Sequence, residues 1–442
     1  MSNDPSDPTI RDKVRPRVRR ALRPLREFIA TESAGAVALV VAAIAALAWA
    51  NSPFSESYET LWETKLSIGV GDEALSLDLR HWVNDGLMTL FFLVVSLEIK
   101  RELVHGELRG IRRAALPVVA AIGGMVVPAS IYFAFNPTGA AASGWGIPMA
   151  TDIAFAVGLI ALVEPRLPQP AKVFLLSLAI VDDIGAILVI ALFYSSALDL
   201  GALALAAGGA ILIYGLRHLG VRWGPVYGTL GVLVWFATLE SGVHATIAGV
   251  VIGFLTPVRP AFEDGWERLK AGAQKLLQQP TPQEARAAKA RAREVVAPGE
   301  WVEHLLHPWT SFAIVPLFAL ANAGIAVDAG TFGDALGSPV AVGTFLGLVV
   351  GKPLGICLAT LLAVRAGVAS LPENTTVKQM VGLGTLAGIG FTVSLFIAEL
   401  AFEEATLVSE AKLGILSASL VAAVVGGVLL QRQHDRRGRI SG

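Results

Sequence analysis

The chain has 442 residues, of which 54% are hydrophobic and 16% charged, and its formal net charge at pH 7 is −1. This composition excludes a soluble domain with a single apolar helix and indicates a polytopic membrane protein. The single cysteine, Cys357, excludes an intramolecular disulfide and a cysteine metal cluster.

Twelve apolar segments predict transmembrane helices, because about 20 helical residues cross the roughly 30 Å hydrocarbon core of a bilayer. The expected fold class is therefore an all-α polytopic membrane protein. Its membrane domain covers 33–430, between a basic segment at 1–32 and a basic tail at 431–442. The approximate limits of the twelve segments are 33–50, 82–98, 114–135, 146–163, 173–195, 201–216, 224–239, 243–258, 305–327, 338–364, 379–401 and 411–430.

Basic residues gather in connections that twelve crossings place on one side of the membrane. Eight Lys/Arg lie in the first thirty residues, eight in the connection 259–302 and four after Gln431. The connection 51–81 instead carries six acids against Lys65 and Arg80. The positive-inside rule therefore predicts that both termini and the connection 259–302 lie in the cytoplasm. No cleavable signal is evident, so we expect the first span to be retained.

Two connections have a pattern of their own. Residues 66–79, LSIGVGDEALSLDL, alternate apolar and polar side chains around Gly71-Asp72, which is typical of a small β-hairpin on the outer side. An irregular loop is the alternative. In the connection 259–302, the stretch Gln283 to Val296 is rich in Ala, Arg, Lys and Glu and predicts a helix. That helix is either a docking segment or a solvated amphipathic helix.

Two adjacent aspartates, Asp182 and Asp183, lie in the middle of the apolar segment Val173 to Phe193. A carboxylate at the centre of a membrane helix costs about 2.5–3.5 kcal/mol on insertion scales. Asp152 and Lys352 are the other ionisable residues near the middle of a predicted span. Nearer to the ends of spans, where snorkelling lowers the cost, lie Asp85, Glu98, Glu240, His244, Glu303 and Glu399.

Three central acids and one central base point to a cation site. Lys352 can pair with one aspartate and leave the others for a hard cation such as Na⁺, which prefers oxygen ligands. Thr151 adds a hydroxyl beside Asp152. Burial disfavours the charged form of each group, so a metal ion and protons can compete for the same carboxylates. The alternative is a structural ion pair of Asp182 with Lys352, which does not explain Asp183.

Helix-breaking residues accompany these charges. Gly144, Gly146 and Pro148 precede Asp152, Pro353 follows Lys352, and four glycines, at 382, 384, 388 and 390, interrupt the eleventh segment. Segments 3–5 and 10–12 thus each have a broken span in the middle of three. Broken helices at corresponding positions of two halves are typical of transporters built from inverted repeats, with the site at the bilayer midplane.

Over residues 30 to 430, the chain resembles bacterial NhaA-type Na⁺/H⁺ antiporters. The resemblance implies twelve helices in inverted repeats, with two broken helices that cross. It rests on the strings ATDIAFAV at 150–157, LAIVDDIGAIL at 178–188, VHATIAGV at 243–250, EHLLHPWT at 303–310, PLFALANAGI at 316–325, GKPLGIC at 351–357 and GIGFTVSLFIAE at 388–399.

The resemblance also implies roles at the matching positions. Asp183 would be the main cation ligand and proton carrier, and Asp182 would pair with Lys352 in the cation-free state and also contribute to cation binding. Thr151 and Asp152 would lie at the helix crossing, where Asp152, with Lys352, balances helix dipoles.

Further matching positions are linked to regulation and assembly. Glu303, His304 and His307 match a cytoplasmic cluster tied to pH activation, and Glu98 and His244 match positions tied to the funnel and the pH response. The hairpin at 66–79 falls where members of the family pair into homodimers. The basic residues before Thr31 and the Arg-rich segment 280–298 match no motif of the family.

The sequence therefore predicts a secondary transporter, not an enzyme. It would export Na⁺ or Li⁺ in exchange for H⁺ across a bacterial inner membrane, in contact with lipid and without a cofactor or a nucleic-acid partner. One alternative is an intramembrane aspartyl protease, because Gly69-Val-Gly71-Asp72 matches a GxGD string, but that string lies in a polar loop. The other is a cation channel or a sodium-coupled symporter. No phosphate-binding loop supports ATP-driven pumping.

Overall fold

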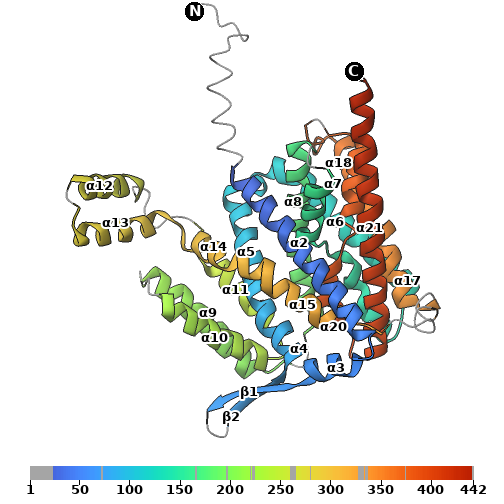
Figure 1. Ribbon diagram of the computed structural model, residues 1–442, viewed down its shortest axis with the longest axis horizontal. Helices are drawn as coiled ribbons and strands as arrows, with labels where there is room; N and C mark the ends of the chain where they lie inside the picture. Colours follow the sequence, from blue (N-terminus) through green and yellow to red (C-terminus); the bar gives the residue numbers. More distant parts are fainter. Residues whose placement is uncertain are drawn as a thin grey trace, which may run out of the picture.

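The computed structural model describes residues 23–440, except 71–72, 165–166, 196–197, 220, 222–223, 259–264, 279, 327–332, 334–336 and 374. Helices form a bundle whose long members run roughly parallel (Figure 1). Of the basic segment predicted at 1–32, residues 1–22 are outside the described residues, and 23–32 are helical.

The elements of the first half of the chain are α2 (Arg23–Ala50), α3 (Ser55–Glu63), β1 (Lys65–Val70), β2 (Glu73–Asp78), α4 (Leu79–His81), the π-helix η1 (Trp82–Leu87), α5 (Met88–His105), η2 (Glu107–Arg109), α6 (Ile111–Phe135), the 3₁₀ helix η3 (Ala140–Met149), α7 (Ile153–Val163) and α8 (Gln169–Phe193). Those of the second half are α9 (Leu200–His218), α10 (Gly224–Glu240), α11 (Thr246–Leu255), α12 (Gly265–Gln278), α13 (Pro282–Val295), α14 (Pro298–Trp309), the π-helix η4 (Thr310–Ile314), α15 (Val315–Asn322), α17 (Pro339–Leu346), the π-helix η5 (Gly347–Gly351), α18 (Lys352–Arg365), α19 (Val377–Leu386), α20 (Phe391–Ala401) and α21 (Ala405–Ile440).

In the part of the chain that the structure describes, the helices long enough to span a membrane are fewer than the twelve predicted segments. Among the described residues, seven helical stretches are long and apolar enough to cross a membrane, or up to nine if each of two bent pairs is one span. The predicted count of twelve is not confirmed. The other three predicted segments fall on η1 with α5, on α10 and on α11. Of these, α10 has 17 residues and α11 has 10, fewer than the roughly 20 that cross a bilayer core.

Two of the predicted spans are bent pairs of helices. The axes of η3 and α7 differ by 41°, and those of α19 and α20 by 48°. Both breaks fall where glycine and proline predicted them. Pro353 does not break its span, contrary to our expectation, because the π-helical turn η5 immediately before Lys352 widens the helix and the helical stretch runs on to Arg365.

Helix α18 packs closely against α6, and this contact positions the start of α18. A Cβ atom added at Gly355 would lie against the carbonyl of Gly123, and one at Gly123 against the carbonyl of Gly355. Small residues let the backbones of two membrane helices approach in this way. This close contact holds α18 against α6. Lys352, the first residue of α18, is thereby positioned in the centre of the bundle.

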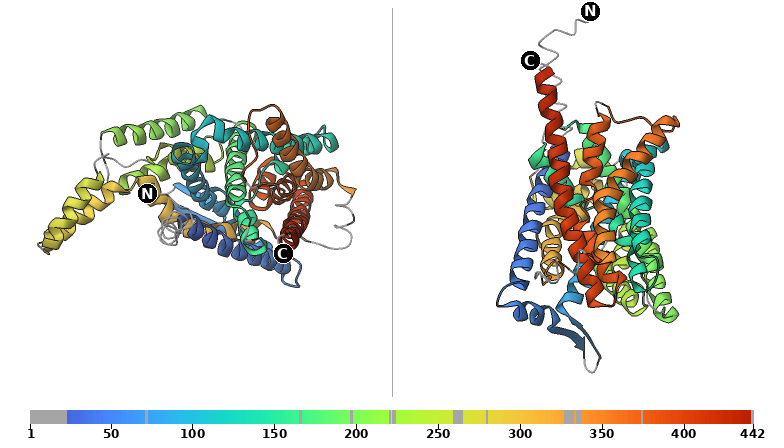
Figure 2. Two further views of the ribbon diagram at one scale, coloured as in Figure 1. Left: turned by 90° about the horizontal axis from the view of Figure 1, so that it is seen from above. Right: turned by 90° about the vertical axis from the view of Figure 1, so that its right-hand side faces the viewer.

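The first and the last described helix reach the same end of the bundle. Helix α2 starts, and α21 finishes, at the end opposite to the two-stranded sheet (Figures 1 and 2). Strands β1 and β2 pair antiparallel, with Lys65 opposite Asp78 and Val70 opposite Glu73, so the predicted hairpin is confirmed. Its turn, Gly71-Asp72, lies outside the described residues. The predicted helix at 283–296 corresponds to α13.

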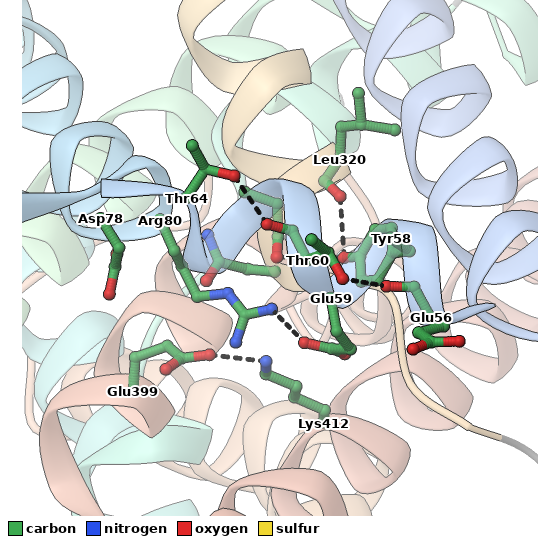
Figure 3. Close-up of polar contacts among 12 residues, drawn as sticks. Glu56, Tyr58, Glu59, Thr60, Thr64, Asp78, Arg80, Leu320, Glu399 and Lys412 are labelled. Carbon is green, nitrogen blue, oxygen red and sulfur yellow. Dashed lines mark hydrogen bonds and ion pairs between the residues drawn. The ribbon is translucent and has the colours of Figure 1, made fainter. Parts of the chain in front are cut away.

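Polar contacts hold α3 and the helices around it together at the hairpin end (Figure 3). The hydroxyl of Tyr58 donates to the carbonyls of Leu320 and Ala321, and burial raises the pKa of Tyr58 to about 12, so the hydroxyl stays a donor. An ion pair of 2.5 Å joins Glu399 on α20 to Lys412 on α21. The second half of a bent pair is thus tied to its neighbour.

Candidate functional site

The two bent pairs meet at their non-helical links. The amide of Asp152 donates to the carbonyl of Ile389 at 2.7 Å, and the hydroxyl of Thr151 lies 2.9 Å from the carbonyl of Ala387. Close by, Ser394 Oγ on α20 donates to the carbonyl of Ile147 in η3 at 2.7 Å. Backbone groups that a break would leave unpaired in an apolar core thus find partners on the opposite bent pair.

Asp152 lies at the start of two helices at once. Its Oδ1 accepts from the amide of Phe155 and caps α7. Its Oδ2 accepts from the amide of Thr392, at 3.1 Å, and from the hydroxyl of Thr392, at 2.7 Å, in the first turn of α20. The positive ends of two helix dipoles therefore face one buried carboxylate, which is a favourable arrangement for a negative charge.

Lys352, Asp182 and Thr151 form a second cluster, and all three side chains are fully buried. Lys352 Nζ lies 2.5 Å from Asp182 Oδ2 and 2.9 Å from Thr151 Oγ1. Thr151 Oγ1 is also 2.7 Å from Asp182 Oδ2. In an apolar interior such a pair is held by its charge and its hydrogen bonds together, and removal of one partner leaves an uncompensated charge.

Asp183 has different surroundings from its neighbour. It is 6% exposed, and its Oδ1 is buried without a hydrogen-bond partner among the described residues. The side chain lines a cavity of about 70 Å³, and Thr151, Asp152 and Thr392 line the same cavity. Oxygen ligands of this kind suit a hard monovalent cation. The cavity has room for a small ion and water.

The same cavity reaches Glu98 on α5 and His307 on α14. Beside it, Arg101 Nη1 lies 2.6 Å from Glu303 Oε1, and a second guanidinium nitrogen lies 4.0 Å from Glu98. The structure thus brings together Glu98, Glu303 and His307. These are three of the five residues that the resemblance linked to the pH response or to the cytoplasmic funnel. His304, the residue after Glu303 on α14, is exposed and points about 100° away around the helix.

His244 lies apart from this group. It stands just before α11, and its ring contacts the backbone of Tyr194 at the C-terminal end of α8. Its Nε2 is buried without a hydrogen-bond partner among the described residues. Helix α8 carries Asp182 and Asp183 in its middle, so His244 reaches the end of the helix that carries the aspartate pair.

Two residues of the site were missed by sequence reasoning. Thr392 supplies both donors to Oδ2 of Asp152. Its string was noted for its glycines and for the family resemblance, but no role was assigned to the threonine. Arg101, which follows the second predicted span, was not singled out. Two signals could have identified them. Thr392 lies two positions after the glycine at the break, and Arg101 lies one helical turn from Glu98.

Comparisons with known proteins show the family of the chain. The sequence model of the family described as Na⁺/H⁺ antiporter 1 matches residues 26–430. The Na⁺/H⁺ antiporter NhaA of Oleidesulfovibrio alaskensis is 48% identical over 424 residues, which cover 93% of this chain and 94% of the relative. NhaA 2 of Sorangium cellulosum is 46% identical over 418 residues, 91% of this chain and 88% of the relative. NhaA of Syntrophobacter fumaroxidans is 46% identical over 423 residues, 92% of this chain and 90% of the relative. The chain, with its two bent helix pairs meeting at buried carboxylates, belongs to the Na⁺/H⁺ antiporter 1 family.

Proposed function

We propose that the protein exchanges Na⁺ or Li⁺ for protons as a secondary active transporter, and that it exports the cation. Relatives that cover most of the chain carry the name Na⁺/H⁺ antiporter. The observation that carries the proposal is the difference between two adjacent aspartates. Asp182 is paired with Lys352 through Oδ2, whereas Asp183 lines the cavity. The Oδ1 atom of each aspartate is buried without a hydrogen-bond partner among the described residues.

Competition at one site is sufficient for coupling. With the site open to the cytoplasm, the cation binds Asp183 together with oxygens of Thr151 and Asp152, and displaces protons. The two bent pairs then rock against the other helices, the site opens outward, and protons replace the cation. A site that cannot hold both ligands well exchanges one for the other.

Lys352 supplies a second group for proton exchange. When the cation takes oxygens of Asp182 as well as Asp183, the pair with Lys352 is broken, and burial then favours the neutral amine. Two protons per cation make the exchange electrogenic. The net inward movement of one charge contributes about 2.3 kcal/mol per 100 mV of membrane potential.

Asp152 and the charged residues beside the cavity would have separate roles. Asp152 balances the helix ends at the crossing, an assignment supported by its hydrogen bonds to both α7 and α20. Glu98, Glu303 and His307, with Arg101, would set the pH response. His304 and His244 are assigned to that response only by position, since neither lies in the cluster.

The remaining parts of the proposal concern placement in the membrane. Twelve crossings in inverted repeats, with both termini in the cytoplasm of a bacterial inner membrane, agree with α2 beginning and α21 ending on one side (Figure 1). We further propose a homodimer formed through the hairpin. Leu66 and Ile68 on β1 are 46% and 59% exposed, which leaves apolar surface for a second copy.

A ΔpH assay tests the exchange. Everted vesicles from an antiporter-deficient host would be acidified inside, and NaCl or LiCl added across a range of pH. Loss of the proton gradient on addition of cation, absent in an Asp183→Asn variant that is inserted at the same level, would support the proposal. Cation flux without proton movement would instead indicate a channel, and a requirement for an organic solute would indicate a symporter.

A further inference from the structure

The connection between α11 and α14 forms a helical hairpin outside the bundle. In Figure 1, α12 and α13 lie across the direction of the long helices, near the end at which α2 begins and α21 finishes. In both Figure 1 and the left view of Figure 2 they extend beyond the outline of the bundle. α13 lies between α12 and the level of α9 and α10 (Figure 1).

One face of α13 packs on α12. Glu284, Ala287 and Ala288, the last two of which lie three and four residues after the first, are half-buried, as are Leu269 and Leu276 on α12, which packs against α13. The opposite face begins with Gln283 and Arg286, which are both exposed.

Helical spacing adds positions 289, 290 and 293 to this opposite face. We call Arg286, Lys289 and Arg293 the basic stripe. In the sequence, the positions of that face, 282, 283, 286, 289, 290 and 293, include no acid.

The surface below the hairpin is apolar. On α9, Leu205, Ile211 and Leu212 are 72%, 70% and 49% exposed, so lipid chains would surround this helix. Lipid headgroups would then lie at the end of α9, which is the level of α13. A helix that lies flat at this level, with Arg286 exposed, is suited to anionic headgroups.

We propose that the basic stripe of α13 binds anionic phospholipid headgroups on the cytoplasmic surface beside α9 and α10. Lys and Arg near a membrane are attracted to anionic lipid, and the hairpin 265–295 carries seven basic residues against three acids. The proposal rests on the proposed cytoplasmic placement of this end, but not on which ions are exchanged. Bound lipid would fix the position of α14, which follows α13 directly and carries Glu303 and His307.

Fluorescence quenching in proteoliposomes tests this contact with the full chain. In a Cys357→Ser background, Gln283→Cys on the basic face would carry an environment-sensitive fluorophore. Vesicles of phosphatidylcholine, with or without phosphatidylglycerol, would contain lipids with a nitroxide on the headgroup. We expect several-fold stronger quenching with phosphatidylglycerol. High salt should reverse it, because the screening length falls from about 30 Å at 0.01 M to about 3 Å at 1 M.

Charge reversal supplies the matched comparison. Arg286→Glu/Lys289→Glu/Arg293→Glu should remove the lipid-dependent part of the quenching, whereas Lys270→Glu/Lys275→Glu on α12 should preserve it. A fluorophore at Leu277→Cys on α12, where the leucine is 83% exposed, should be quenched less than one at 283.

Equal quenching in both lipid mixtures, or quenching unchanged by reversal of the stripe, would overturn the proposal. A probe that stays in water in both mixtures would also overturn it and favour a soluble acidic partner. Cation/proton exchange would be measured in the same vesicles. Loss of exchange with intact lipid-dependent quenching would therefore count against the proposed function alone.

Discussion

Lys352 Nζ lies 2.5 Å from Asp182 Oδ2, and neither side chain is exposed. The contact joins α18 to α8, and Thr151 from the first bent pair bonds to both partners. One ion pair thus connects helices from both halves of the chain. A ligand that competes with Lys352 for Asp182 would therefore affect α8, α18 and the first bent pair together.

Lys352→Ala is expected to lower the free energy of unfolding by about 3–5 kcal/mol, because it leaves Asp182 buried without its partner. Lys352→Ala/Asp182→Asn should recover much of that loss, since no buried charge is then left over. Thermal unfolding of the purified variants in detergent measures both effects. Strictly additive losses in the double variant would show that the two side chains do not stabilise the fold as a pair.

Asp183→Asn and Asp182→Asn are expected to differ in stability, although both should abolish exchange. Asp183 has no described partner on its buried Oδ1, so its neutral amide should leave the unfolding temperature unchanged or raise it. Asp182→Asn removes the partner of Lys352 and should lower that temperature. The unfolding temperature of each purified variant would be measured, and its exchange would be measured with the ΔpH assay. Equal unfolding temperatures for the two variants would contradict the assigned difference.

Gly388→Ala is expected to impair folding and exchange. An added Cβ would lie 2.5 Å from the carbonyl oxygen of Leu348 and 3.0 Å from that of Thr385, so the link between α19 and α20 would have to move. Gly208→Ala in α9 is the matched control, because an added Cβ there meets nothing within 4 Å. That change should be neutral or stabilise by about 0.5–1 kcal/mol, as for other helical glycines. Normal insertion and exchange in Gly388→Ala would show that the link is not tightly packed.

Lys412→Met is expected to destabilise the hairpin end of the bundle. It leaves Glu399, whose side chain is 20% exposed, without the amine that lies 2.5 Å away (Figure 3). Lys270→Met is the control: it breaks an ion pair with Glu267 at a similar distance, but both of those side chains are more than half exposed. Exposed pairs contribute at most about 1 kcal/mol. Similar unfolding temperatures for the two variants would mean that burial adds nothing to the Glu399–Lys412 pair.

Much of the architecture could be predicted because it depends on local properties of the chain. Apolar runs marked the helices, glycine and proline marked both bends, and alternation marked β1 and β2. The prediction was weaker where a local signal has two structural outcomes. Pro353 looked like a break, yet the π-helical turn before it lets the helix continue. Span number was also uncertain, because helices as short as α11 give no clear length signal.

The sequence by itself determined that Asp152, Asp182, Asp183 and Lys352 lie in apolar segments, where a charge needs a partner or a ligand. Only the tertiary structure decided which partner each one has. Adjacent residues on a helix point about 100° apart, so Asp182 and Asp183 cannot both face α18. Asp182 contacts Lys352 and Asp183 faces the cavity because α6 and the first bent pair pack on particular sides of α8, and no local pattern encodes that packing.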